Sequence, residues 1–507
     1  MALCRTHTVA LVGLSGHPIE VEVDISDGLP SYILLGLPDA ALSESRERVR
    51  SALVNSGAPW PNRKVTVSLS PAWLPKSGSS YDLPIAVALL GAQALIDVTH
   101  HDQTIFLGEL GLDGQIRGVR GTLPAILAAR NQGVKTAVIS PENYVEAQSV
   151  PGIEIIPVNS LSALIEFLKS GEFALPQLAH EPGAQNRNLD LSDVAGQLVA
   201  RNALEISAIG GHHLLFIGPP GTGKTMLAER IPTILPELTH EQSLDVAAIA
   251  SISGSGKGSE RISLTPPFIS PHHSTTATAM VGGGSHAIRP GAVSLANNGV
   301  LFIDEAPECG NGVLDSLRQP LESGSVTISR SVATVTFPAK FILVLAANPC
   351  PCGKFSGRGR SCTCSSVQIR RYLQKISGPL LDRIDIKVFV DAPTRVEMAA
   401  QDLGESSEVV RARVINARAV ALERFGNENW NLNSEIPANF LRKKFAAEKI
   451  GMNYLHQELD QERLSARGFH KVIRLSWSIA DKLGHSIPTL SDVQSALLMR
   501  SEMSVNP

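Results

Sequence analysis

A glycine-rich loop between an apolar stretch and a predicted helix has the residue types of a phosphate-binding site. Residues 214–217 (LLFI) are expected to form a buried strand, residues 218–225 (GPPGTGKT) follow, and a helix is expected from Met226 onwards. Glycines let backbone N–H groups close around phosphate oxygens, and the helix N-terminus adds its dipole there. Lys224 is expected to reach the β- and γ-phosphates, and Thr225 to hold Mg²⁺. This order predicts a nucleoside triphosphate site, with an ordinary glycine-rich turn as the alternative.

Two adjacent carboxylates follow a second apolar stretch. Residues 299–303 (GVLFI) are predicted as a buried strand, and Asp304 and Glu305 come directly after it. Asp304 is expected to hold Mg²⁺ through water, and Glu305 to polarise the attacking water. Such a pair could be accidental by itself, but it is the expected partner of a phosphate-binding loop. The predicted nucleotide-binding residues are Gly218, Pro219, Pro220, Gly221, Thr222, Gly223, Lys224, Thr225, Met226 and Asp304.

Four of the six cysteines lie close together in the sequence, at Cys350, Cys352, Cys362 and Cys364. Four thiolates on one short loop match the tetrahedral coordination of a structural Zn²⁺. Only one residue separates the two members of each pair, which is less usual than two, and four unliganded thiols are the alternative. The clustering favours metal over disulfides, as in a reducing cytosol. Packing is the role expected of the remaining cysteines, Cys4 and Cys309.

Composition limits the class of protein that contains these residues. The chain has 507 residues, of which 43% are hydrophobic and 18% charged, enough for several globular cores. Its net charge of −3 gives no overall basic field, so binding to a polyanion would need local patches. No apolar run is long enough to span a bilayer, and the N-terminus becomes polar too soon for a signal peptide. We expect a cytoplasmic protein without a membrane partner.

The N-terminal third alternates short strands and helices, which predicts a compact α/β domain. Strands are expected at 19–25, 31–35, 64–69, 104–107, 136–139 and 153–156, and helices at 43–56, 83–95 and 123–131. The stretch at 173–188 is polar, contains two prolines and lacks periodicity, so it is interpreted as a linker between domains.

Two motifs in this N-terminal third resemble the Lon-type protease domain, in the variant found in Mg-chelatase-like proteins. They are PKSGSSYDLPIA at 75–86 and GELGLDGQIRGV at 108–119. The resemblance places Ser80 at the nucleophile position, but the position of the partner lysine falls at or beside Leu123. A Ser hydroxyl without an adjacent base is a poor nucleophile, so the domain is expected to be proteolytically inactive. The alternative role of Ser79 and Ser80 is a turn that caps the next helix.

Three further residues are assigned by resemblance to AAA+ ATPases. Residues 341–350 (FILVLAANPC) are predicted as a strand ending at Asn348, which matches the sensor 1 position. Residues 377–388 resemble the arginine-finger segment of Mg chelatases and MCM helicases, in which Arg383 would reach a neighbouring subunit's γ-phosphate. Arg467, in an amphipathic helix, matches sensor 2. The resemblance thus implies the catalytic set Glu305, Asn348, Arg383 and Arg467. An ion pair is the alternative for Arg383, with Asp382 or Asp385.

Two segments are expected to face the substrate. Residues 253–292 contain PHH near GGG and resemble the helix-2 insert of the same AAA+ branch, and residues 323–338 alternate as in a β-hairpin. In rings of this class both segments project towards the central pore. Basic side chains there would contact phosphates without reading sequence, and solvated loop charges are the alternative. The candidates are Lys257, Arg261 and Arg330, with Lys354, Arg358 and Arg360 in the cysteine loop.

The order of these motifs along nearly the whole chain is similar to that of the YifB/ComM family of Mg-chelatase-like AAA+ ATPases. NPCPCG at 348–353, GPLLDRIDI at 378–386 and SARGFH at 465–470 complete the series. Three positions depart from the family pattern. A Glu, a His and an Arg are usual where this sequence has Ala292, Asn297 and Ile269. The change at Ile269 puts one basic contact in doubt, but not ATP hydrolysis.

The resemblance implies an α/β multidomain protein. A Lon-protease-like domain of the ChlI type would occupy 1–175, a linker 176–190, an AAA+ core with a parallel sheet 191–393, and an α-helical lid 394–507. It further implies an ATPase that uses ATP and Mg²⁺, with a structural Zn²⁺ as a further candidate. The expected assembly is an ATP-dependent homohexamer. Its expected substrate is single-stranded or branched DNA, as in a DNA helicase that drives branch migration during recombination or natural transformation (competence).

Two rival functions remain open on the sequence alone. One is the motor subunit of a magnesium chelatase, although those motors generally lack both the N-terminal domain and the cysteine loop. The other is a peptide-remodelling or scaffold protein that uses the Lon-like domain. The response of the ATPase to DNA, to a porphyrin with a chelatase partner, or to peptides discriminates among the three.

Overall fold

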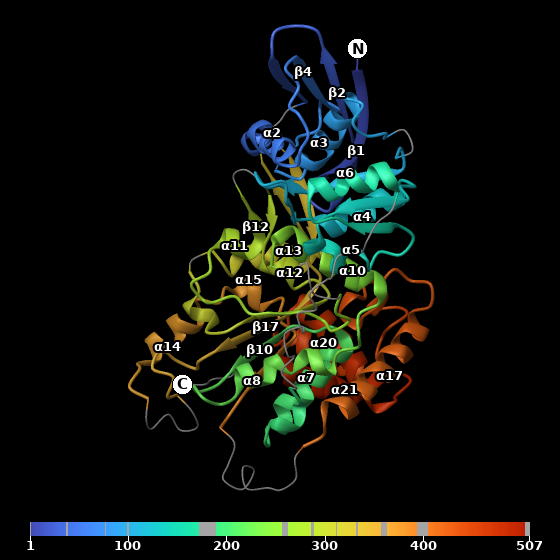
Figure 1. The fold of residues 1–507 in the computed structure, drawn as a ribbon. Helices are drawn as coiled ribbons and strands as arrows, with labels where there is room; N and C mark the ends of the chain where they lie inside the picture. Colours follow the sequence, from blue (N-terminus) through green and yellow to red (C-terminus); the bar gives the residue numbers. More distant parts are fainter. Residues whose placement is uncertain are drawn as a thin grey trace.

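A computed structural model describes residues 2–36, 39–76, 78–98, 101–171, 189–255, 262–284, 288–310, 312–330, 333–355, 362–392 and 404–501. An N-terminal α/β region, a central parallel sheet and a C-terminal group of helices follow one another along the chain (Figure 1). The predicted fold class, α/β with a parallel-sheet core and a helical C-terminal region, is confirmed.

Seven strands form the N-terminal sheet, in the order β3–β4–β2–β1–β5–β8–β9. Their bounds are β1 (Ala2–Val12), β2 (Ser15–Ser26), β3 (Ser31–Leu35), β4 (Lys64–Ser70), β5 (Thr104–Leu107), β8 (Thr136–Ile139) and β9 (Glu154–Pro157). β1, β2 and β4 pair antiparallel, whereas β5, β8 and β9 pair in parallel. The helices that pack on this sheet include α2 (Ser45–Asn55), α3 (Asp82–Ala92), α4 (Thr122–Asn131), α5 (Tyr144–Ala147) and α6 (Leu161–Ser170).

The sequence did not predict strand β1, because polar residues interrupt its apolar pattern. Thr6 and Thr8 are nevertheless buried, and the Thr6 hydroxyl donates to the carbonyl oxygen of Pro84 at 3.0 Å. The expected helix at 43–56 is also divided, since α1 (Ala40–Ser43) and α2 are separate helices that meet at Glu44. The other predicted elements of this region are present, with ends that differ by up to four residues.

Five parallel strands form the central sheet, in the order β11–β14–β17–β10–β18. They are β10 (Leu214–Ile217), β11 (Phe268–Ile269), β14 (Gly299–Ile303), β17 (Phe341–Ala347) and β18 (Ile386–Phe389). Every residue of β10 and β14 is buried, as expected for strands covered on both faces. Residues Ile217 and Ala347 are register partners, as are Ile303 and Leu345, so these three strands end side by side.

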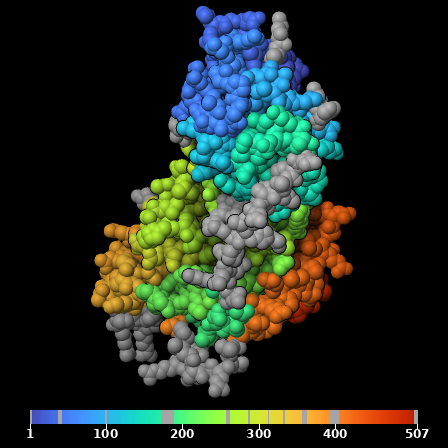
Figure 2. Space-filling view, in the orientation of Figure 1, coloured from blue at the N-terminus to red at the C-terminus, as the bar shows by residue number. Residues whose placement is uncertain are grey.

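The N-terminal region rests directly on the central region, as Figure 2 shows. Helix α10 (His240–Ser253) packs Leu244 and Ala248 into the same apolar cluster as Leu123 of α4. The predicted hairpin at 323–338 is confirmed as β15 (Ser325–Ser329) and β16 (Thr334–Pro338), and its Val335 lies against the turn between β1 and β2. The two regions therefore share apolar packing at both α10 and the hairpin.

The C-terminal helices pack on the central sheet through α7 (Leu198–Gly210) and on one another. They include α17 (Ser407–Phe425), α19 (Lys449–Asp460), α20 (Ala466–Leu483) and α21 (Leu490–Ser501). The guanidinium of Arg424 pairs with the buried Asp481 and lies 4.0 Å from the ring centroid of Trp477. In the part of the chain that the structure describes, no helix has both the length and the apolar character to cross a bilayer.

We predict that His213, which directly precedes β10, makes the protein less stable in acid. Burial lowers the pKa of His213 to about 4, from an ordinary value of 6.5, and its Nδ1 accepts the backbone N–H of Leu343 at 3.1 Å. Between these two pH values the unfolded chain binds the proton and the folded chain does not. The free energy of unfolding should therefore fall as the pH drops from about 6.5 to 4, by at most about 1.4 kcal/mol per pKa unit.

The test compares chemical denaturation of the wild type and His213→Asn across this pH range. The Asn side-chain oxygen can still accept the Leu343 N–H but does not titrate. The stability of the wild type relative to the variant should decline towards acid pH. A difference that stays constant from pH 7 to pH 4 would contradict a His213 that is neutral in the folded protein.

Candidate active site

The glycine-rich loop begins where β10 ends and closes at the N-terminus of α8 (Lys224–Glu229). Gly221 and Gly223 have φ angles of +76° and +85°, in the left-handed region that favours glycine. A Cβ at Gly218 would lie 2.1 Å from the carbonyl oxygen of Val390. The loop therefore has a conformation in which three of its residues need to be glycine.

The other residues of the loop support its shape. The Thr222 hydroxyl donates to the Pro219 carbonyl oxygen at 2.9 Å, and the Gln197 amide donates to the Thr222 carbonyl oxygen at 2.6 Å. Pro220 lies against Gly353 of the cysteine loop, and Met226 packs on the core beneath α8. Sequence reasoning did not identify Gln197, whose only signal is its place in the segment before α7.

Lys224 is held over the loop by three oxygen atoms. Its ammonium donates to the carbonyl oxygens of Gly218 and Pro219 at 2.7 and 2.8 Å, and lies 3.4 Å from Oδ1 of Asn348. Burial lowers the pKa of Lys224, and the nearby carboxylates of Asp304 and Glu305 oppose that shift. The structure thus brings together Lys224 and Asn348, two predicted site residues that lie 124 positions apart.

Thr225 and Asp304 meet on the other side of the site. The Thr225 hydroxyl donates to Oδ2 of Asp304 at 2.8 Å, and the backbone N–H of Glu305 donates to Oδ1 at 2.8 Å. Because the hydroxyl gives its proton to the carboxylate, its lone pairs remain available for a cation. A hydroxyl and a carboxylate are oxygen ligands of the kind that Mg²⁺ prefers, so these residues fit the predicted metal.

Glu305 occupies an unusual backbone conformation at the end of β14. Its φ and ψ are 48° and 42°, and it directly precedes the short helix Ala306–Glu308. A left-handed conformation at a residue other than glycine costs on the order of 1 kcal/mol and is frequent at functional sites. The side chain is 48% exposed, so water can reach its carboxylate.

Arg383 and Arg467 lie apart from this cluster. Arg383 donates to the Pro379 carbonyl oxygen at 2.6 Å and pairs with Glu322. The alternative of an ion pair with Asp382 or Asp385 is therefore wrong, since Asp385 instead contacts Lys471 at 2.6 Å. Arg467 lies in the first turn of α20, is 74% exposed, and has Asp382 as its charged neighbour at 3.9 Å.

The four clustered cysteines converge in space as well as in sequence. Their Sγ atoms all lie within 4.8 Å of one another, and three of the pairs are 3.3 to 3.7 Å apart. Tetrahedral Zn²⁺ with Zn–S bonds of about 2.3 Å places sulfurs about 3.8 Å apart. The donor set therefore fits Zn²⁺.

Ser79 and Ser80 lie in the turn that precedes α3, as the alternative role predicts. The Ser79 hydroxyl donates to Glu109, and the N-terminus of α3 has no side-chain cap, so the predicted capping role is wrong. Leu123 is fully buried in α4. The ammonium of Lys76 donates to the Pro71 carbonyl oxygen.

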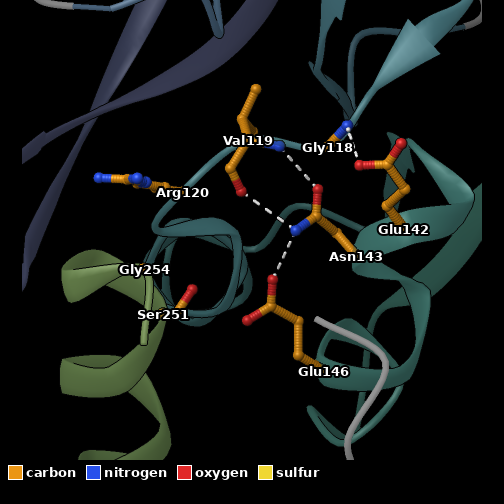
Figure 3. A pocket seen from close by; sticks show the side chains of 8 residues that line it. All are labelled: Gly118, Val119, Arg120, Glu142, Asn143, Glu146, Ser251 and Gly254. Atoms are coloured by element: carbon orange, nitrogen blue, oxygen red, sulfur yellow. Dashed lines mark hydrogen bonds between the residues drawn. The ribbon is translucent and has the colours of Figure 1, made fainter. Parts of the chain in front are cut away.

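A polar hollow lies where the N-terminal region meets α10 (Figure 3). Asn143 donates to Glu146 at 2.7 Å and exchanges hydrogen bonds with the backbone of Val119 at 2.9 and 3.0 Å. Glu142 accepts the backbone N–H of Gly118 at 3.1 Å, and burial raises the pKa of Glu146. The hollow contains none of the predicted site residues. These hydrogen bonds join the backbone at 118–119 to residues 142 and 143.

Three family models match successive parts of the chain. "Magnesium chelatase, subunit ChlI" matches residues 190–398, "Subunit ChlI of Mg-chelatase" matches 21–143, and "Magnesium chelatase, subunit ChlI C-terminal" matches 404–500. The chain is 40% identical to the competence protein ComM of Haemophilus influenzae, over 96% of this chain and 94% of that protein. It is 41% identical to YifB of Escherichia coli, over 99% and 97%. The magnesium-chelatase subunit ChlI of Cyanophora paradoxa is 24% identical, over 56% and 80%.

The central parallel sheet carries the phosphate-binding loop at the end of β10 and the carboxylate pair Asp304–Glu305, the Walker B motif, at the end of β14. Together with the matching family model, this arrangement defines an AAA+ ATPase. The chain belongs to the YifB/ComM family of Mg-chelatase-like AAA+ proteins.

We predict that Glu305→Gln lowers the rate of ATP hydrolysis by about 100-fold or more, because the amide cannot accept a proton from water. The affinity for ATP should stay close to that of the wild type, since the contacts of Lys224 and Thr225 are unchanged. Single-turnover hydrolysis and equilibrium binding of a fluorescent ATP analogue separate these two effects. Glu308→Gln is the matched control, because Glu308 lies three residues further on and faces Lys375 at 3.4 Å. Normal turnover by Glu305→Gln would remove Glu305 from the catalytic role.

Proposed function

We propose that this chain is an ATP-driven motor that acts on DNA, as a helicase or branch-migration factor. The observation that supports ATP hydrolysis is the hydrogen bond from the Thr225 hydroxyl to Asp304, next to the contact between Lys224 and Asn348. In this proposal Lys224 binds the β- and γ-phosphates, Thr225 and Asp304 hold Mg²⁺, Glu305 activates water, and Asn348 contacts the γ-phosphate or the water.

The proposed assembly is a homohexamer in which each nucleotide lies between two copies. Arg383 contacts its own Glu322 rather than its own glycine-rich loop, which is consistent with an arginine that serves the neighbouring copy. Arg467, exposed at the start of α20, would act as sensor 2 from the lid. We place the Lon-like domain at 1–175, the linker at 176–190, the AAA+ core at 191–393 and the lid at 394–507.

The DNA part of the proposal rests on two observations. The first is the hairpin β15–β16, which carries the exposed Arg330 at its tip, where the Arg330 N–H bonds to the Ala333 carbonyl oxygen at 3.0 Å. The second is full-length similarity to a relative named as a competence protein. Lys354 is also exposed, whereas the other candidates, Lys257, Arg261, Arg358 and Arg360, lie outside the described residues.

The two rival functions have less support. The chelatase subunit covers only 56% of this chain, whereas ComM and YifB cover nearly all of it. A peptide-handling role would depend on the Lon-like domain, in which Ser79 is bonded to Glu109 and Lys76, the lysine nearest to Ser80 in the sequence, is bonded to Pro71. Either rival would gain support if ATP turnover responded to a porphyrin or a peptide and not to DNA.

We predict that single-stranded or forked DNA raises the ATPase rate, and that added salt weakens the effect because phosphate contacts release counterions. Arg330→Ala should raise the DNA concentration for half-maximal stimulation by about tenfold. The slope of log affinity against log salt concentration should also become less negative, by about one for each phosphate that Arg330 neutralises. Arg463→Ala is the control, since this lid arginine is also exposed and pairs with Glu458. An ATPase that ignores every DNA across the salt series would contradict the proposal.

We further propose that Cys350, Cys352, Cys362 and Cys364 hold one structural Zn²⁺. A Cβ at Gly353 would lie 2.8 Å from Pro220, so this metal would stiffen the loop that supports the glycine-rich loop. Protein purified without chelators should contain close to one zinc per chain by elemental analysis. Cys362→Ser should lose most of it, and Cys309→Ser should keep it, because Cys309 lies outside the cluster. Absence of zinc from the wild type would favour four free thiols.

A further inference from the structure

Arg383 lies in the short connection between α15 (Gly378–Leu381) and β18, an edge strand of the central sheet. Leu380 and Ile384, on either side of it, are fully buried in the apolar core. The place of the Arg383 side chain therefore depends on how this connection is held. The connection ends at Asp385, a carboxylate residue that is only 7% exposed.

Two of the C-terminal helices hold this connection from one side. The Lys471 ammonium of α20 donates to Oδ1 of Asp385 at 2.6 Å, and Arg500 of α21 donates to the Ile384 carbonyl oxygen at 2.9 Å. Burial alone would raise the pKa of Asp385, but the charge of Lys471 and the hydrogen bond from His212 hold it well below its ordinary value. Asp385 is therefore an ionised acceptor at neutral pH, next to the backbone of Arg383.

The other carboxylate oxygen of Asp385 faces the residues that precede β10. Oδ2 accepts from Nδ1 of His212 and from the backbone N–H of His213, both at 3.4 Å. The backbone N–H groups of Asp385 and Ile386 in turn donate to the His213 carbonyl oxygen at 3.1 Å. Nε2 of His212 lies 2.8 Å from the Ser478 hydroxyl, so this buried imidazole also connects to α20.

Strand β10 connects this network to the nucleotide site of the same copy. The strand begins directly after His213, and Gly218 at its far end begins the glycine-rich loop. Asp385 thus joins the connection that carries Arg383, the strand that leads to the loop, and helix α20. A buried carboxylate is costly without its donors, so this arrangement leaves the backbone beside Arg383 little freedom to shift by itself.

We infer that Asp385 is a positioning residue that fixes the connection carrying Arg383 and ties it to β10 and α20 of the same copy. This inference deepens the proposed function and rests on it, because it takes Arg383 to serve the nucleotide of a neighbouring copy. A change at the glycine-rich loop or in α20 of one copy would reach the neighbouring nucleotide through Asp385 and Arg383. Asp385 itself is assigned no contact with nucleotide.

The first test is ATP turnover by full-length Asp385→Asn, whose amide keeps the shape of the side chain but loses the charge that pairs with Lys471. Turnover should fall about tenfold, because Arg383 loses its alignment, and the ATP dissociation constant should stay within about twofold. Asp82→Asn is the matched control and should keep wild-type turnover. Asp82 is also a buried carboxylate, and it pairs with Arg48 of the N-terminal region at 2.6 Å.

Mixed assemblies distinguish the positioning of Arg383 from a general loss of structure. A Glu305→Gln copy is expected not to hydrolyse ATP, but its Arg383 is intact and can serve a neighbouring Asp385→Asn copy. An equal mixture of these two variants should therefore turn over ATP about threefold faster, or more, than the mean of the two alone. A copy damaged only in its own nucleotide site would gain nothing from the mixture. Arg383→Ala mixed with Glu305→Gln is the reference for full recovery.

Arg500→Met provides a second variant that leaves the buried pair of Asp385 and Lys471 intact. It removes the donor to the Ile384 carbonyl oxygen, so turnover should fall by a smaller factor, about threefold, and should also recover in the mixture with Glu305→Gln. Circular dichroism and size-exclusion chromatography establish that each variant is folded and assembled as the wild type is.

The outcomes separate this inference from the proposed assembly. Normal turnover by folded Asp385→Asn would overturn the inference, as would a loss that stays in a mixture with Glu305→Gln while Arg383→Ala recovers in its own mixture. If Arg383→Ala does not recover, Arg383 does not serve a neighbouring copy. In that case the proposed assembly is wrong, and the role assigned to Asp385 falls with it.

Discussion

Parallel pairing of β10 with β17, and of β17 with β14, is the constraint on which the nucleotide site depends. The carboxyl ends of parallel strands meet at one edge of a sheet, and three polar segments therefore emerge together. They carry Lys224 and Thr225, Asn348, and Asp304 with Glu305. The apolar strands are buried on both faces, and the Lys224–Asn348 and Thr225–Asp304 pairs lie at hydrogen-bonding distance at their ends.

The surrounding regions restrain this edge from several sides. The cysteine loop follows Asn348 directly and packs Gly353 on Pro220, so a bound metal would brace the glycine-rich loop. The insert places His273 on Glu305 and packs on the Arg330 hairpin. The N-terminal sheet in turn contacts the hairpin at Val335 and helix α10 through α4. The N-terminal region thereby shares a core with the elements that surround the ATP site.

Local sequence order was sufficient to predict which residues meet at this edge of the central sheet. Strand, glycine-rich loop and helix are consecutive in the chain, and Asp304 and Glu305 follow their strand directly, so no knowledge of distant contacts was needed. Contacts between distant segments were not predictable in this way. The partner of Arg383 is Glu322 rather than a neighbour in sequence, and the contact of His273 with Glu305 depends on the two-residue strand β11. Strand β1 was missed because the buried Thr6 finds its hydrogen-bond partner only in the folded protein.

The most direct test of the central claim is equilibrium binding of ATP, with and without Mg²⁺, to the wild type, Lys224→Ala and Asp304→Asn by titration calorimetry. We expect tight binding by the wild type that strengthens with Mg²⁺, and little binding by Lys224→Ala. Asp304→Asn should bind ATP but lose the effect of Mg²⁺, because a neutral amide replaces the carboxylate beside Thr225. Unchanged ATP binding by Lys224→Ala, or a full Mg²⁺ effect in Asp304→Asn, would contradict a nucleotide site at this edge of the sheet.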